Sequence, residues 1–114
     1  MKILVLKTCD TCRRARTWLD GNGIAHEAHD VRTDGLTRET VERVVDAVGP
    51  ERAVNRRSTT WRNLGAARET PLTQDHAVDL IMGEPTLMKR PVFLREHDVL
   101  VGFDDTVREA LAKA

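Results

Sequence analysis

The beginning of the chain changes from a strand-like to a helix-like hydrophobic pattern and back. Residues 2–6 form a nearly continuous apolar run, which is typical of a strand buried on both faces. A helix with an apolar stripe is expected to follow and to end at residues 21–23, and its stripe consists of Ala15, Trp18 and Leu19. Residues 24–31 have a weaker strand pattern, because polar side chains interrupt the alternation. The order β-α-β is therefore predicted.

A helical region follows. Its clearest helix begins after Thr37, ends at Gly49-Pro50, and repeats valine at helical spacing, at Val41, Val44, Val45 and Val48. Short helical segments are expected at residues 51–54 and 61–64, with a polar loop between them. Another helix is expected to begin at Thr73 or Asp75 and to end at Gly83, with Ala77, Leu80 and Ile81 facing inward.

The last part of the chain has the pattern of a hairpin and a helix. Two short apolar runs, 92–94 and 99–101, flank a polar turn and predict two antiparallel strands. Asp104 is expected to cap a final helix whose inner face carries Val107, Ala110, Leu111 and Ala114. The order β-α-β, helices, β-β-α predicts an α/β thioredoxin-like fold with a mixed, mostly four-stranded sheet. We expect a single domain over residues 1–114, with a helical insertion at about 36–86.

Composition narrows the classes of function. The 18 basic and 18 acidic residues give a formal net charge of zero, which argues against direct nucleic-acid binding. No apolar run approaches the roughly 20 residues of a membrane span, and no signal-peptide pattern opens the chain. We therefore expect a cytoplasmic monomer that binds no membrane.

Both cysteines of the chain, Cys9 and Cys12, lie between the first strand and the first helix. Strand, C-x-x-C and helix is the local order of a thioredoxin-like redox site. A helix N-terminus favours the thiolate, because its unpaired N–H groups and its dipole attract negative charge. Asp10 is the expected N-cap, so Cys9 would precede the cap and be the more accessible thiol.

Other interpretations of this segment stay open. Arg13 and Arg14 oppose the helix dipole, which suggests that they stabilise an anion, although both side chains would equally well point into solvent. A zinc site would need two more ligands, and the only histidines are His26, His29, His76 and His97. We expect no metal and no bound cofactor. Two inert structural thiols are a further alternative.

Four ordered motifs resemble the arsenate-reductase-like group of thioredoxin-fold proteins, which includes the ArsC, Spx and YffB branches. They are Cys9-Asp10-Thr11 with residues 14–19 and 34–36, Asn55-Arg56 with residues 59–64, residues 89–92, and residues 101–103. The match runs nearly end to end. The chain is most similar to the YffB branch, whose members are thought to be glutathione-dependent thiol reductases.

The resemblance implies roles for individual residues. Cys9 would be the nucleophile, Arg56 would face it from the helical region, and Arg90 would precede a cis-proline, Pro91. We also expect Asp10, Thr11, Arg13, Arg57 and Pro91 to bind substrate. Two guanidinium groups near a cysteine would favour its thiolate and offer paired donors to an oxyanion or a carboxylate.

The chain departs from the family pattern at two places. Arsenate reductases carry a third arginine near the end of the hairpin, where this chain has Gly102-Phe103. Cys12 is absent from arsenate reductases and from typical YffB members, whereas Spx regulators use such a pair as a disulfide switch. The first departure makes arsenate a less suitable substrate, and the second makes Cys12 a candidate resolving thiol.

We therefore expect a thiol-disulfide oxidoreductase, a thiol reductase that attacks with Cys9 and uses glutathione as co-substrate. Its partners would be glutathione or another small thiol or disulfide, and glutaredoxin as a protein partner. The alternatives are an Spx-like redox-switched regulator that binds RNA polymerase, an arsenate reductase, and an inactive family member that only binds.

Overall fold

The computed structural model describes residues 1–65 and 70–113. In chain order the elements are β1 (Lys2–Val5), α1 (Asp10–Gly21), β2 (Glu27–Asp30), α2 (Arg38–Val48), α3 (Pro50–Ala53), α4 (Thr59–Arg62), α5 (Gln74–Gly83), the 3-10 helix η2 (Pro85–Leu87), β3 (Val92–Leu94), β4 (Val99–Val101) and α6 (Asp105–Ala112). Ala114, which we expected on the last helix, lies outside the described residues.

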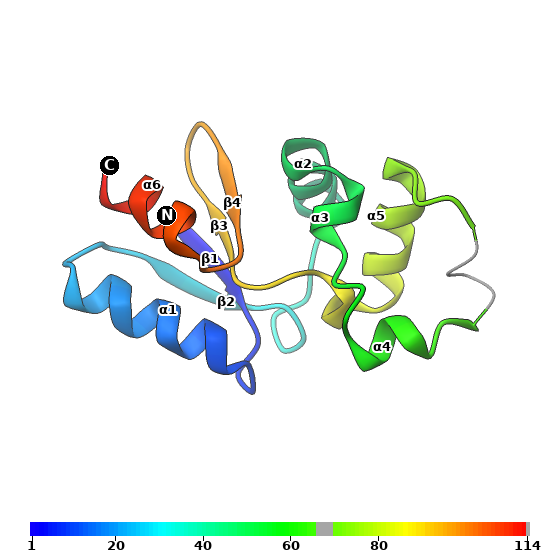
Figure 1. Cartoon of the computed structure of the whole chain (residues 1–114), viewed down its shortest axis with the longest axis horizontal. Coiled ribbons are helices and arrows are strands. Elements are labelled where there is room, and N and C mark those ends of the chain that lie inside the picture. Colours follow the sequence, from blue (N-terminus) through cyan, green and yellow to red (C-terminus); the bar gives the residue numbers. More distant parts are fainter. Residues whose placement is uncertain (66–69, 114) are drawn as a thin grey trace.

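The four strands form one mixed sheet in the order β2-β1-β3-β4. β1 pairs in parallel with β2, whereas β1 with β3 and β3 with β4 pair antiparallel. The helices α2 to α5 and η2 lie between β2 and β3 in the sequence and form the right-hand part of the molecule in Figure 1. The predicted α/β thioredoxin-like fold, with helices inserted between its two halves, is confirmed.

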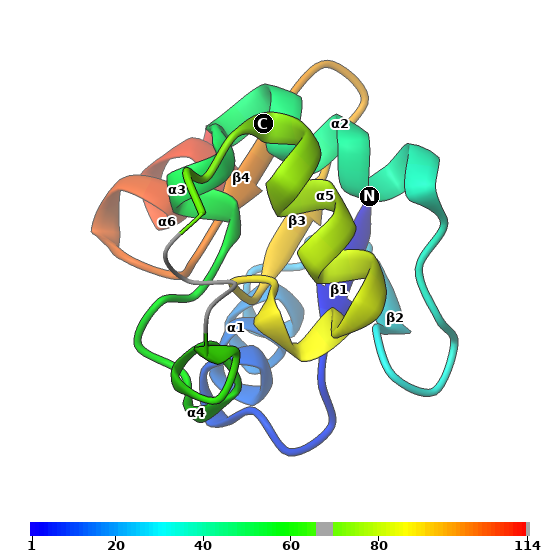
Figure 2. The same ribbon diagram turned by 90° about the vertical axis from the view of Figure 1, so that its right-hand side faces the viewer.

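The two faces of the sheet are covered by different helices (Figures 1 and 2). Ile3 and Val5 point to one face, where they pack with α1, α6 and the fully buried Phe93. Leu4 and Leu6 point to the other face, toward a core built largely from α2, α5 and η2. This two-sided burial explains the uninterrupted apolar run of β1. Cys9 contacts both cores.

Three local predictions need correction. Cys9, not Asp10, caps α1: its backbone is extended and its Sγ accepts the N–H of Cys12 at 3.4 Å. β2 is shorter than residues 24–31, because the N–H of Ile24 still donates to Leu19 at the end of α1. On α5, Val78 joins Ala77 and Ile81 in full burial, and Leu80 is partly buried against the same core, so the predicted inner face gains one residue.

Candidate functional site

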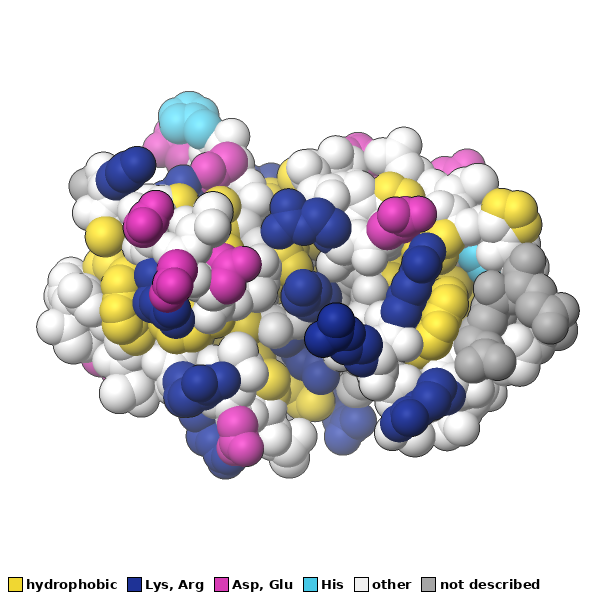
Figure 3. Space-filling view, viewed as in Figure 1, with side chains coloured by type: hydrophobic (Ala, Val, Ile, Leu, Met, Phe, Trp, Pro, Cys, Tyr) yellow, Lys and Arg dark blue, Asp and Glu magenta, His cyan; other side chains and the backbone are white. Residues whose placement is uncertain are grey.

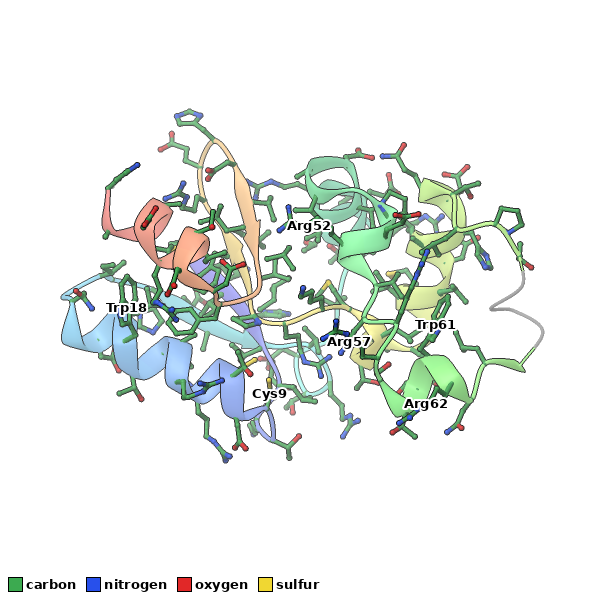
Figure 4. All side chains as sticks on the ribbon, in the orientation of Figure 1. Cys9, Trp18, Arg52, Arg57, Trp61 and Arg62 are labelled. Atoms are coloured by element: carbon green, nitrogen blue, oxygen red, sulfur yellow. The ribbon has the colours of Figure 1, made fainter. Side chains whose placement is uncertain are left out.

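Cys9 ends the loop between β1 and α1 and is held from both sides (Figure 4). Its N–H donates to the carbonyl of Leu6 at 2.9 Å, and its Sγ accepts the N–H of Cys12. The side chain is half-buried, and no disulfide joins the two cysteines. A thiol at the N-cap of a twelve-residue helix lies where unpaired backbone donors and the helix dipole favour negative charge.

The pKa of the Cys9 thiol is lowered. Partial burial acts in the opposite direction, but the hydrogen bonds from Cys12 and the charge and hydrogen bonding of Arg90 outweigh it. A lower pKa means a larger thiolate fraction at neutral pH, and the thiolate is the reactive form. Cys9 therefore has the environment of a nucleophile.

Cys12 has the opposite environment. Its side chain is 1% exposed, and burial together with the neighbouring Cys9 raises the pKa of its thiol to about 12. The thiol is consequently protonated at neutral pH. The structure thus gives the two cysteines of the motif distinct chemical states, an accessible one with a lowered pKa and a buried one with a raised pKa.

Arg90 is fixed beside the cysteines by its own backbone environment. Its Nη1 donates to the carbonyls of Thr86 at 2.8 Å and Met88 at 3.0 Å. Its Nε is buried and has no hydrogen-bond acceptor among the described residues. The Arg90–Pro91 peptide is cis, in agreement with the resemblance. One edge of the guanidinium is therefore anchored, while its charge acts on Cys9.

The side chain of Arg56 contacts other residues of the helical region and not the cysteines. Its guanidinium carbon lies 5.8 Å from the centre of the Trp61 ring, and its Nη2 is 3.6 Å from Glu51. Its described side-chain contacts go to these two residues, and Arg90 is the arginine that lowers the pKa of Cys9. The prediction that Arg56 faces the cysteine thus finds no direct contact to support it.

Asp10, Thr11 and Arg13, the residues of α1 that we expect to bind substrate, form side-chain hydrogen bonds within the helix. Arg13 donates to the Asp10 carboxylate, and Arg14 donates to Thr11 at 3.4 Å. The side chains of Arg13 and Asp10 are largely exposed. Their contact with a substrate stays a prediction.

A pocket of about 410 Å³ gathers basic residues from two distant segments. It brings together the predicted site residues Arg56, Arg57 and Arg90 with Arg52 and Lys89, for which the sequence predicts no role. Basic side chains gather in the middle of the molecule in Figure 3, and Figure 4 shows Arg52 and Arg57 there. The signal in the sequence was the density of basic residues: three among residues 52–57 and two at 89–90.

Gly102 stands where a third arginine was expected in an arsenate reductase. Its φ is +86°, a conformation that disfavours any side chain. The Cε of Lys89 is 3.6 Å from the position that a Cβ would take at Gly102. The stem of a lysine therefore covers this glycine.

Asp30 is a buried carboxylate that ties the cysteine loop to the turn after β2, and sequence reasoning missed it. Its carboxylate accepts the N–H groups of Lys7 at 2.9 Å and of Arg32 and Thr33 at 2.8 Å each. Burial alone would raise the pKa of Asp30, but these three N–H donors outweigh it and hold the pKa below 3.8. Loss of the carboxylate would leave donors of the cysteine loop unpaired.

We expect Asp30→Asn to lower the free energy of unfolding by about 1–3 kcal/mol near neutral pH, the cost of unpaired buried donors. Because the folded pKa is depressed, the ionised carboxylate stabilises the fold above its ordinary pKa and loses this effect as the pH falls through the folded value. Urea unfolding from about pH 7 to about pH 3 should therefore show the variant and the wild type converging. The exposed Asp20→Asn is the control, and a loss independent of pH would contradict the prediction.

Residues 1–65 and 70–113 contain neither a cluster of metal ligands nor a membrane-spanning helix. No three histidine, cysteine, aspartate or glutamate side chains gather there as a metal ion would require. No helix in that part of the chain has the length and apolarity needed to cross a membrane.

Comparison with known proteins identifies the family. The ArsC family model matches residues 4–111. The chain belongs to the ArsC family. An uncharacterized protein of Haemophilus influenzae is 37% identical over 105 residues, which are 92% of each chain. The solved YFFB protein superposes with a TM-score of 0.91, at 34% identity and over 97% of both chains.

Regulators also resemble this member of the ArsC family. The global transcriptional regulator Spx of Streptococcus agalactiae serotype V is 29% identical over 109 residues, which are 93% of this chain and 79% of Spx. The relatives thus include transcriptional regulators as well as a protein without an assigned activity, so family membership does not by itself decide between an enzyme and a regulator.

Proposed function

We propose that this ArsC-family protein is a thiol-disulfide oxidoreductase in which Cys9 is the nucleophile and glutathione the co-substrate. The contrast between the two thiols carries the proposal: the pKa of Cys9 is lowered at a helix N-terminus beside Arg90, whereas Cys12 is buried with a pKa of about 12. An accessible thiolate is what attack on a disulfide requires, and a second thiol three residues away can resolve the mixed disulfide that forms.

The reaction begins when the Cys9 thiolate attacks one sulfur of a disulfide. A bond forms between Cys9 and that sulfur, and the other half leaves as a thiolate that takes a proton from solvent. Arg90 supports this step, because its fixed positive charge stabilises the attacking anion. The helix N-terminus acts in the same direction.

Cys12 is then suited to resolve the mixed disulfide. Burial is the largest cause of the high pKa of Cys12, and Cys9 adds to it through hydrogen bonding and charge. Once Cys9 is part of a neutral mixed disulfide, its charge no longer opposes ionisation of Cys12. The Cys12 thiolate attacks the Cys9 sulfur and the substrate thiolate leaves. Two molecules of glutathione then reduce the Cys9–Cys12 disulfide and leave as one molecule of oxidised glutathione.

The experiment that tests this sequence uses oxidised glutathione and Cys12→Ser. We expect the variant to retain one glutathione on Cys9, since no second thiol can displace it. The wild type should pass through the adduct to an internal disulfide, and intact mass spectrometry of timed, acid-quenched samples distinguishes the two products. A wild type that keeps its adduct as long as Cys12→Ser would exclude Cys12 as the resolving thiol and leave glutathione to do so.

A redox-switched regulator is the second candidate, favoured by the presence of both cysteines and by the similarity to Spx. In that case, formation of the Cys9–Cys12 disulfide would change the affinity for a protein partner such as RNA polymerase. Catalytic turnover distinguishes the candidates, because a switch would react once per oxidation event whereas an oxidoreductase would reduce many disulfides in the presence of glutathione.

A further inference from the structure

The pocket beside Arg90 carries far more positive charge than the rest of the molecule. The chain as a whole has a formal net charge of zero. The pocket, in contrast, is lined by one carboxylate, that of Glu51, and by five basic residues, Arg52, Arg56, Arg57, Lys89 and Arg90. This concentration of charge comes from two segments that are more than thirty residues apart in the sequence, so the fold assembles it.

Three of these basic side chains have no counter-charge. Arg52, Arg57 and Lys89 make no side-chain hydrogen bond or ion pair with any residue in 1–65 or 70–113, although other arginines do pair, as Arg38 with Asp79 and Arg95 with Asp98. Like charges gathered in one pocket repel one another, and a bound anion removes that repulsion. The three side chains therefore have the properties of an anion subsite.

The charge balance indicates the kind of anion. Glu51 is 77% exposed and lies 3.6 Å from Arg56, so the pocket holds no unpaired carboxylate for a substrate ammonium group. A substrate whose disulfide carries an arm (the group attached to one of its two sulfurs) with a net charge of minus two and no cation best fits this excess of positive charge. Guanidinium forks match the oxygens of a phosphate, and a lysine adds a mobile point charge.

We propose that Arg52, Arg57 and Lys89 form a subsite for the phosphate group of a phosphorylated low-molecular-weight disulfide whose sulfur reacts with Cys9. The inference rests on the proposed function. Arg90 connects this subsite to the reactive cysteine, because it lines the pocket and its charge also acts on Cys9. The chemistry is the exchange described above: Cys9 forms a disulfide with the phosphorylated arm, and the other arm leaves as a thiolate that takes a proton from solvent.

A matched pair of disulfides tests the subsite. Pantethine and 4′-phosphopantetheine disulfide differ only in the phosphate, and both are offered to the full chain with Cys12→Ser, so that the mixed disulfide accumulates. We expect the phosphorylated compound to react at least about tenfold faster at low salt, the lower range for charge focusing in a cleft. Added salt should reduce the advantage, because the lining is open to screening ions.

Variants locate the effect. Arg57→Gln and Lys89→Gln should bring the two rates close together, because they slow the phosphorylated compound far more than pantethine. Arg16→Gln, an exposed arginine on α1 outside the pocket lining, should leave the ratio unchanged. Pantethine should react with Arg16→Gln at the wild-type rate, and thermal unfolding of all three variants shows that each is folded.

The outcomes separate the two proposals. Equal rates for both disulfides, or a ratio that Arg16→Gln reduces as much as Arg57→Gln does, would overturn the phosphate subsite and leave the oxidoreductase intact. A faster reaction with oxidised glutathione than with the phosphorylated compound would overturn the selectivity. If pantethine, its phosphorylated form and oxidised glutathione all fail to react with Cys9, the proposed function itself fails.

Discussion

Cys9→Ser is expected to reduce mixed-disulfide formation and glutathione-dependent disulfide reduction to the background rate of the buffer. A serine hydroxyl does not ionise near neutral pH and does not displace a thiolate from a disulfide, so no other group on the described surface replaces Cys9 in the first step. Cys12 does not substitute for it, because its thiol is 1% exposed and its pKa is raised to about 12. The measurement is the rate of glutathione oxidation with a disulfide substrate, together with intact mass after exposure to oxidised glutathione.

Cys12→Ser is the matched control, since it alters the other thiol of the same motif. This variant should still form the adduct, which shows that loss in Cys9→Ser reflects the position of the thiol and not the loss of a cysteine as such. Thermal unfolding should be compared in both variants, because Cys9 also caps α1. Appreciable turnover in a folded Cys9→Ser protein would refute the assignment of the nucleophile.

Arg90→Gln is expected to slow the reaction of Cys9 at neutral pH by about fivefold, which corresponds to about 1 kcal/mol for a charge pair open to solvent. The charge of Arg90 lowers the pKa of Cys9, so its removal raises that pKa and reduces the thiolate fraction. The pH dependence of the rate checks the direction of this pKa change. The variant should approach the wild type as the pH rises, because Cys9 is then ionised in both proteins. A neutral disulfide such as 4,4′-dithiodipyridine reports the rate without attraction between substrate and protein.

Arg14→Gln provides the control for Arg90→Gln. Arg14 is an exposed arginine on the second turn of α1, and it donates to Thr11. Its replacement should leave the pH profile of Cys9 unchanged. An equal slowing of both variants at every pH would contradict the role of Arg90. Arg90→Gln also removes the hydrogen bonds to Thr86 and Met88, so unfolding curves are needed to separate stability from reactivity.

The spacing of apolar residues along the chain predicted most of the helices and strands of this fold. β1 was evident because both of its faces are buried, so every position from Ile3 to Leu6 is apolar. The helix after Thr37 was evident because a surface helix buries only one stripe. The end of α1 and the start of β2 were less well predicted, since hydrogen bonds of the last turn hold Ile24, and side-chain pattern does not report them.

The candidate site likewise contains residues that the sequence predicted and residues that it did not. Sequence indicated the cysteine pair, Arg90 and the proline after it, because the C-x-x-C follows a strand and the family motifs are local. It placed the N-cap one residue too late, because Cys9 is an unusual cap whose role depends on a hydrogen bond to its sulfur. It did not identify Asp30, since a carboxylate in a polar turn has no periodicity that would reveal its burial.

The sequence by itself determined the order of elements, the family and the residue that bears the reactive thiol, because these depend on local pattern and on contiguous motifs. Only the tertiary structure decided which charges act on that thiol. It brought Arg90 to Cys9, turned Arg56 toward Trp61, and joined Arg52 and Arg57 with Lys89 in one pocket. Electrostatic effects depend on distances between side chains, and for residues far apart in the chain those distances are set by packing of the helices against the sheet.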